Sequence, residues 1–118
     1  MITIYHNPRC SKSRETLALI ESLNPSSAPV NIVEYLKTPP TVQELEALHR
    51  QLARPVRDML RDNEEPYKTL GLAREDLTDA QAYEAIAAHP ILLQRPIVVY
   101  KNKAAIGRPP EAVRGLFE

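Results

Sequence analysis

The stretch Ile4-Tyr5-His6-Asn7-Pro8-Arg9-Cys10-Ser11-Lys12-Ser13-Arg14 holds the only cysteine of the chain and predicts how the fold begins. A β-prone run over residues 2–5 leads into an Asn-Pro turn, and apolar residues at three- and four-residue spacings predict a helix over residues 11–23. Cys10 is therefore expected where a strand hands over to a helix N-terminus. Unpaired backbone N–H groups and the positive end of the helix dipole favour an anion at such a position.

This position favours a reactive thiol at Cys10. Arg9, Lys12 and Arg14 add positive charge nearby, and cationic helix N-termini lower the pKa of a cysteine. Only roughly 3% of an unperturbed thiol is ionised at neutral pH, so a lowered pKa greatly enlarges the nucleophilic fraction. A free cysteine is more often a small buried hydrophobic residue. Charged neighbours on a turn argue against burial here.

The composition indicates a single globular domain. The chain has 118 residues, of which 43% are hydrophobic and 25% charged, and its formal net charge is zero. No global field would draw nucleic acid or an anionic membrane. No apolar run reaches membrane-spanning length, and no signal-peptide pattern is present. One cysteine cannot form an internal disulfide, so we expect a cytoplasmic protein, and we expect it to be a monomer.

Sequence patterns predict the element order β-α-β, then helices, then β-β-α. Strands are expected at residues 2–5, 30–35, 96–100 and 104–106, and residues 24–29 form a loop. Capping-box patterns start two of the helices, at Thr41 with Glu44 and at Thr78 with Gln81. Residues 109–110 with an acidic neighbour open a last helix.

This order predicts an α/β fold of the thioredoxin-like (glutaredoxin-like) plan. The two halves, residues 1–36 and 90–118, would form one mixed four-stranded sheet with flanking helices. Residues 37–89 would form a helical insert between them. The whole chain, residues 1–118, is thus expected to be one domain.

Spacing excludes several cysteine chemistries. A dithiol oxidoreductase needs Cys-x-x-Cys, but Ser13 occupies the second position. A cysteine phosphatase loop needs an arginine where Thr16 stands. His6, His49 and His89 give no recognisable zinc cluster with the single cysteine, so no metal is expected. A Cys-His hydrolase using His6 stays conceivable but lacks an oxyanion-hole pattern. The reading best supported is one nucleophilic thiol that needs thiols from elsewhere.

Four stretches together resemble the glutaredoxin-dependent arsenate reductases, an ArsC-like family, and they look closest to a short subgroup of it. The resemblance covers essentially the whole chain. The stretches are the N-terminal one quoted above, Met59-Leu60-Arg61-Asp62-Asn63 with Glu65-Pro66-Tyr67, His89-Pro90-Ile91-Leu92 through Arg95-Pro96-Ile97-Val98-Val99, and Ile106-Gly107-Arg108-Pro109.

The resemblance implies a set of site residues. The family's catalytic cysteine falls on Cys10, and its three oxyanion-binding arginines fall on Arg61, Arg95 and Arg108. Guanidinium groups bind tetrahedral oxyanions such as arsenate through paired hydrogen bonds. The substrate-binding or thiolate-stabilising positions fall on three further residues, His6, Asn7 and Ser13.

Two details of this set stay open at the level of sequence. His6 could lower the pKa of the thiol through a nearby charge or hydrogen bond, or it could satisfy backbone groups. By analogy with thioredoxin-like folds, Pro96 is a candidate cis-proline facing the cysteine. His49 and His89 are expected to be structural or incidental.

The resemblance also implies a reaction. The Cys10 thiolate would attack arsenate, with glutathione as co-substrate and glutaredoxin as the partner that completes reduction to arsenite, and with no tightly bound cofactor. Two alternatives are a Spx-like regulatory protein that binds RNA polymerase and a general glutathione-linked thiol oxidoreductase of the same fold. Ser13 argues against the first, whose redox-switching members usually carry Cys-x-x-Cys. In a general thiol oxidoreductase, loss of Arg61 or Arg108 should reduce activity less than loss of Cys10 does.

Overall fold

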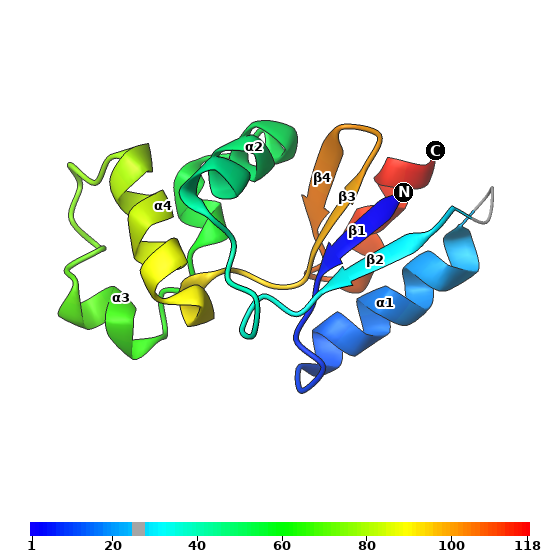
Figure 1. The fold of residues 1–118 in the computed structure, drawn as a ribbon, viewed down its shortest axis with the longest axis horizontal. Helices are drawn as coiled ribbons and strands as arrows, with labels where there is room; N and C mark the ends of the chain where they lie inside the picture. Colours follow the sequence, from blue (N-terminus) through cyan, green and yellow to red (C-terminus); the bar gives the residue numbers. More distant parts are fainter. Residues whose placement is uncertain (25–27) are drawn as a thin grey trace. The chain divides into compact units, whose positions relative to one another are not determined.

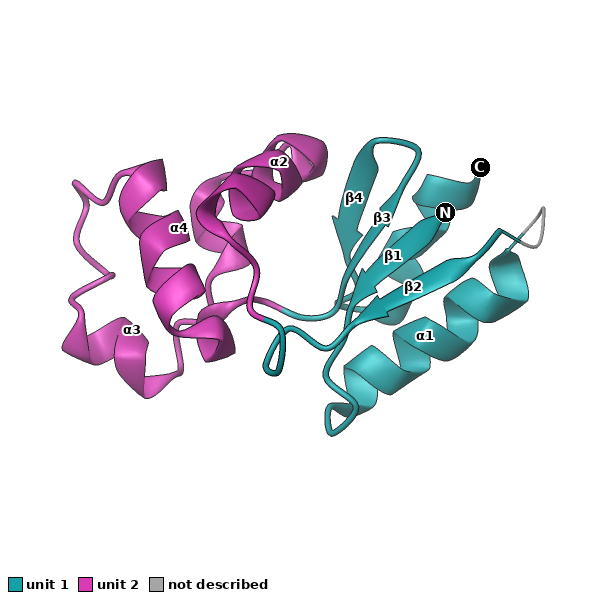
Figure 2. Cartoon of the chain, in the orientation of Figure 1, with its two compact units in different colours: residues 1–38, 95–118 teal, residues 39–94 magenta. Residues whose placement is uncertain are grey.

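The computed structural model describes residues 1–24 and 28–118, so part of the expected loop over residues 24–29 lies outside the described residues. The chain forms two compact units (Figure 2). The first contains residues 1–38 and 95–118, and the second contains residues 39–94.

A mixed sheet of four strands carries the first unit (Figure 1). The strands are β1 (Ile2–Tyr5), β2 (Val30–Val33), β3 (Ile97–Tyr100) and β4 (Lys103–Ile106). Their order is β2-β1-β3-β4, with β1 parallel to β2 and antiparallel to β3, and with β3 antiparallel to β4. The predicted mixed thioredoxin-like sheet is confirmed.

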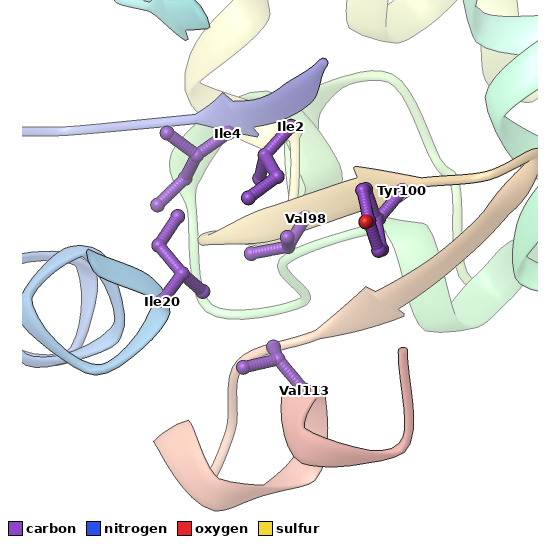
Figure 3. Packing of buried hydrophobic residues seen from close by; sticks show 6 residues of the cluster. All are labelled: Ile2, Ile4, Ile20, Val98, Tyr100 and Val113. Atoms are coloured by element: carbon purple, nitrogen blue, oxygen red, sulfur yellow. The ribbon is translucent and has the colours of Figure 1, made fainter. Parts of the chain in front are cut away.

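One face of this sheet packs against two helices, α1 (Ser11–Leu23) and the 3₁₀ helix η3 (Pro110–Phe117). Ile2 and Ile4 are fully buried, whereas the alternate residues of β1 are partly exposed, as the period of a strand requires. Figure 3 shows how side chains from strands and helices meet in the core, which comprises Ile2, Ile4, Ile20, Val98, Tyr100 and Val113. Burying each large aliphatic side chain contributes about 1.5–3 kcal/mol.

Three elements differ in detail from the sequence expectation. β2 ends at Val33 rather than at residue 35, because the Glu34 carbonyl accepts the N–H groups of residues 37 and 38 and turns the chain. The loop before β4 is only two residues long, and Lys101 and Asn102 both have positive φ (51° and 64°). Positive φ at both positions is typical of a type I′ hairpin turn. The last helix is 3₁₀ rather than α.

The second unit, residues 39–94, is helical, and its bounds differ from those of the expected insert over residues 37–89. It contains α2 (Val42–Leu52), η1 (Val56–Met59), α3 (Glu65–Thr69), α4 (Asp79–Ala88) and η2 (Pro90–Leu92), and α2 packs against α4. Both predicted capping boxes are confirmed. The Thr41 hydroxyl accepts the Glu44 N–H at 3.1 Å, and the Glu44 carboxylate accepts the Thr41 N–H at 2.9 Å. Thr78 and Gln81 repeat the same pair of bonds.

Membrane-spanning helices and clusters of metal-ligating side chains are both absent from the described residues. Over residues 1–24 and 28–118, none of the helices combines the length and the apolar character that crossing a membrane would require. In the same part of the chain, His, Cys, Asp and Glu side chains do not gather in threes at a possible metal site.

Candidate active site

Cys10 occupies the N-cap of α1, as the sequence predicts. Its backbone is extended (φ −95°, ψ 123°), and its carbonyl accepts the Arg14 N–H at 3.0 Å in the first turn of the helix. The N–H of Cys10 donates to the Asn7 carbonyl at 3.0 Å. The thiol is partly buried and faces the free N–H groups at the start of α1.

Asn7 holds the loop between β1 and α1 in shape. Its side-chain oxygen accepts the Arg9 N–H at 3.0 Å, an Asx-turn, and its own N–H donates to the Ser13 hydroxyl at 3.0 Å. At the exposed side, the Arg14 guanidinium donates to the Pro8 carbonyl at 3.0 Å. Both ends of the loop are thereby tied to the first turn of α1, which fixes the backbone around Cys10.

His6 and Ser13 form a buried pair beneath this loop. The Ser13 hydroxyl lies 2.7 Å from His6 Nδ1, and both side chains are buried. Because the hydroxyl oxygen already accepts the Asn7 N–H, its proton is available to His6 Nδ1, which suits a neutral imidazole. Burial lowers the pKa of His6, with Arg14 lowering it further and Glu34 opposing the shift. His6 thus contacts the loop through Ser13, and its role toward the Cys10 thiolate stays a prediction.

The pKa of Cys10 lies below its ordinary value. Burial raises the pKa of the thiol, but the nearby backbone N–H groups of Ser13 and Lys12 and the charges of Arg95 and Arg108 outweigh burial. The Arg108 contact is direct, since its Nη2 lies 3.5 Å from Cys10 Sγ. Its Nε donates to the Arg95 carbonyl at 2.7 Å. Arg108 therefore links the sulfur to the backbone at Arg95.

The cations that stabilise the thiolate are distant in sequence. Among the neighbours expected to contribute, Lys12 forms an ion pair with Glu15 at 3.6 Å, and Arg14 is engaged with the Pro8 carbonyl. The electrostatic contributions come from Arg95 and Arg108 instead. The thiol lies at a helix N-terminus as predicted, but the charges that lower its pKa are those of Arg95 and Arg108 rather than those of its neighbours in sequence.

Both of these arginines precede a cis-proline. The Arg95–Pro96 peptide bond is cis, as the analogy with thioredoxin-like folds predicts, and the Arg108–Pro109 bond is cis as well, which sequence reasoning missed. The two segments are joined by a hydrogen bond from the Gly107 N–H to the Pro96 carbonyl at 2.9 Å. The two arginines are thus carried by adjacent backbone segments of the first unit.

Arg61 belongs to the second unit, where it directly follows the buried Leu60. Its N–H donates to the Leu92 carbonyl at 2.8 Å, and its guanidinium Nη2 lies 3.0 Å from a carboxylate oxygen of Glu64. Its side chain is only 14% exposed, so it is held in place rather than extended into solvent. An ordinary surface arginine would be far more exposed.

The other two histidines make contacts within the helical unit. His49 Nε2 lies 2.8 Å from the Arg54 carbonyl and its Nδ1 lies 2.6 Å from the Tyr83 hydroxyl. His89 ends α4, and its N–H donates to the Ala85 carbonyl. Both contacts agree with the structural role expected from sequence.

These features give the first unit a thiol of lowered pKa beside groups that can bind an anion. The Arg108 guanidinium contacts the sulfur, the charge of Arg95 acts on it, and the N–H groups at the start of α1 lie nearby, an arrangement that would suit attack of a thiolate on an oxyanion. The same groups would stabilise negative charge that moves from sulfur to oxygen during such an attack.

Comparison with known proteins agrees with this geometry. A sequence profile described as the ArsC family matches residues 5–116. The chain is 48% identical over 113 residues to an arsenate reductase of Haemophilus influenzae, covering 95% of each chain. It is 46% identical to an arsenate reductase of Escherichia coli strain K12 over 95% of this chain and 77% of that protein. An arsenate reductase structure from Vibrio cholerae superposes with a TM-score of 0.90 at 47% identity, over 98% of this chain and 96% of that chain.

Proposed function

The chain belongs to the ArsC family, and from this we propose that it is an arsenate reductase whose nucleophile is Cys10. The observation that carries the proposal is the contact of 3.5 Å between Arg108 Nη2 and Cys10 Sγ, in a setting that lowers the pKa of the thiol. A thiolate held against a guanidinium group is at once a nucleophile and half of an anion site.

Arsenate would bind against the cations of this site. It is a dianion near neutral pH, and guanidinium groups offer paired donors that match two of its oxygens. Arg95 and Arg108 would supply these donors, and the family resemblance assigns the same role to Arg61. Each charged hydrogen bond would contribute about 1.5–3 kcal/mol to binding.

The first chemical step would form a bond between sulfur and arsenic. The Cys10 thiolate attacks As(V), the S–As bond forms, one As–O bond breaks, and the oxygen leaves as water after accepting protons. Neither sulfur nor arsenic changes its oxidation state in this displacement. The arginines would offset the charge that builds on the arsenate oxygens.

Reduction would then require two electrons from thiols outside the chain. Glutathione forms a second S–As bond with loss of another oxygen as water, and a glutaredoxin thiolate attacks the glutathione sulfur. That S–As bond breaks with its electron pair left on arsenic, which falls from +5 to +3, while the two external thiols become one mixed disulfide. Hydrolysis of the Cys10–arsenic bond releases arsenite and regenerates the thiol. The single cysteine of the chain supports this division of labour.

The same chemistry suggests where the protein acts and what it carries. A mechanism that takes two electrons from external thiols at each turnover suits the reducing cytoplasm. No tightly bound cofactor is required, because glutathione is consumed as a co-substrate and glutaredoxin acts in passing. One copy of the chain carries Cys10 and all three proposed arginines, in keeping with a monomer.

The test is arsenite production by the purified protein with glutathione, glutaredoxin, glutathione reductase and NADPH. We expect NADPH oxidation that depends on arsenate and is absent from the Cys10→Ser variant, whose circular dichroism should match the wild type. Omitting either glutathione or glutaredoxin should also stop turnover. Arsenite formation by Cys10→Ser would refute the nucleophile. Full activity with thioredoxin in place of both thiols would refute the reductant, and no activity at all would refute arsenate as substrate.

A further inference from the structure

Gly107 lies where no other residue fits without movement. A Cβ atom at this position would lie 2.6 Å from Thr16 Oγ1, 2.8 Å from Pro96 Cγ and 3.0 Å from Thr16 Cγ2. Two of these separations are shorter than Cβ contacts in real proteins. The backbone at residue 107 can therefore approach α1 this closely only because the residue is glycine.

Thr16 forms the helix side of this contact. It is fully buried, lies in the second turn of α1, and donates its hydroxyl to the Lys12 carbonyl at 2.8 Å. The same oxygen lies 3.5 Å from the Gly107 carbonyl. On the other side, the Gly107 N–H donates to the Pro96 carbonyl at 2.9 Å. Gly107 is thus fixed between the helix that carries Cys10 and the proline that follows Arg95.

The residue after Gly107 is the arginine that touches the sulfur. Arg108 Nη2 lies 3.5 Å from Cys10 Sγ, and Arg108 Nε lies 2.7 Å from the Arg95 carbonyl. Charged hydrogen bonds weaken steeply when donor and acceptor separate or lose alignment. A shift of the backbone at residue 107 would be passed directly to both contacts.

We propose that Thr16 and Gly107 are positioning residues, and that their close approach sets the depth at which the Arg108 guanidinium meets the Cys10 sulfur. Neither residue touches the sulfur itself. Their effect on the thiol follows from the structure alone, and only the consequence for arsenate turnover rests on the proposed function.

A purely structural contact would have a different signature. Loosening it would lower the free energy of unfolding but leave the ionisation of Cys10 unchanged. A positioning contact changes the thiol even in protein that is fully folded. The readouts are therefore the thiolate absorbance as a function of pH and the rate of alkylation by iodoacetamide at neutral pH, neither of which needs arsenate.

The central comparison is Gly107→Ala against Gly115→Ala, the same substitution in the same unit. A Cβ atom at Gly115 meets nothing within 4 Å, so this control should behave as wild type. In Gly107→Ala we expect the pKa of the thiol to rise. Alkylation should slow by up to about two-fold if the N–S distance opens to ~5 Å, or up to about seven-fold if the contact is lost, from Coulomb's law with the dielectric constant of water. If folded Gly107→Ala is alkylated at the wild-type rate, the proposal is overturned.

A second set of variants keeps the test decisive if Gly107→Ala folds poorly. Thr16→Ala only removes atoms, and it frees Gly107 from one of its two restraints, so alkylation should again slow. The double variant Gly107→Ala/Thr16→Ala places the new methyl group in the space that Thr16 Oγ1 and Cγ2 vacate. We expect it to alkylate faster than Gly107→Ala, because the clash with Thr16 is removed and only the close approach to Pro96 Cγ remains. Equal rates for Thr16→Ala, the double variant and wild type would overturn the proposal, while loss of arsenate turnover in the wild type would count only against the proposed function.

Discussion

Replacing Arg108 by alanine tests the electrostatic basis of the site most directly. The guanidinium is the cation in contact with the sulfur, at 3.5 Å, and it also donates to the Arg95 carbonyl. Arg108→Ala removes both contacts and leaves the backbone donors at the start of α1 in place. The variant therefore isolates the contribution of one charge to the thiolate.

The size of the effect follows from the distance. Two unit charges 3.5 Å apart attract by about 1.2 kcal/mol at the dielectric constant of water and about 5 kcal/mol at an effective value of 20. Arg108 is exposed, so the solvent limit applies and the lower figure is the appropriate one. About 1.2 kcal/mol corresponds to a roughly seven-fold lower ratio of thiolate to thiol. Because Arg95, Lys12 and Ser13 still act on the sulfur, the pKa should rise without full return to its ordinary value.

The assay is the pH dependence of alkylation by iodoacetamide, followed in parallel by thiolate absorbance. Alkylation at neutral pH should slow by up to about seven-fold, with the midpoint displaced to higher pH. Arg114→Ala is the matched control, because Arg114 is an exposed arginine of η3 that does not contribute to the pKa of Cys10. Arg108→Lys keeps the charge but has one nitrogen for two contacts, so it should fall between wild type and Arg108→Ala.

One result would refute the reasoning. If Arg108→Ala is folded and titrates like Arg114→Ala, the contact seen in the structure does not stabilise the thiolate. The lowered pKa of Cys10 would then have to come from the helix N-terminus and Arg95 alone. Arg108 could still bind arsenate, and its effect would be confined to the KM.

Three further predictions concern other parts of the molecule. Arg61→Ala should raise the KM for arsenate by about 10- to 150-fold, which corresponds to about 1.5–3 kcal/mol of lost binding free energy. Arg50→Ala, on the exposed face of α2, is the control and should leave the KM unchanged. Equal kinetics of the two variants would show that Arg61 does not bind arsenate. Burial lowers the pKa of His6 below 6.5, so on acidification the unfolded chain binds a proton before the folded one, and the free energy of unfolding of the wild type falls below that pH. In urea titrations, the excess unfolding free energy of the wild type over His6→Gln should therefore shrink from about pH 7.5 to about pH 5.5. A difference that stays constant over this range would contradict the prediction. Thr41→Ala should lower the unfolding free energy by about 1 kcal/mol, measured by the same titration, while Thr41→Ser, which keeps the hydroxyl, should not.

The parts of the fold that sequence predicted well are those fixed by local interactions. The N-terminal strand, α1 and both capping boxes depend on residues within a few positions of each other, and all were found where expected. The end of β2 was predicted too late in the sequence, because a backbone hydrogen bond turns the chain there. β2 ends early because the Glu34 carbonyl accepts two N–H groups of the following turn. The residue types at positions 34–38 do not predict these two hydrogen bonds.

The candidate site divides in the same way. The position of Cys10 at a helix N-terminus was predictable, because both neighbouring elements are local. The cations that act on it were not derivable from spacing, since Arg108 reaches the sulfur across 98 residues of sequence. Only the family resemblance pointed to Arg95 and Arg108. The contact of Thr16 with Gly107 had no sequence signal beyond a glycine placed before an arginine.

Ser13 leaves this site with a single thiol, so any further thiols would have to come from other molecules. It stands where a dithiol enzyme would carry its second cysteine, but its hydroxyl accepts the Asn7 N–H and lies 2.7 Å from His6 Nδ1. That pair fixes the loop that carries Cys10, and Ser13 is fully buried. The Ser13 hydroxyl thus holds the loop around Cys10, whereas a cysteine at this position would supply a second thiol. In the mechanism proposed above, an adduct on Cys10 would meet no second thiol of its own chain, so the electrons for its reduction would come from external thiols.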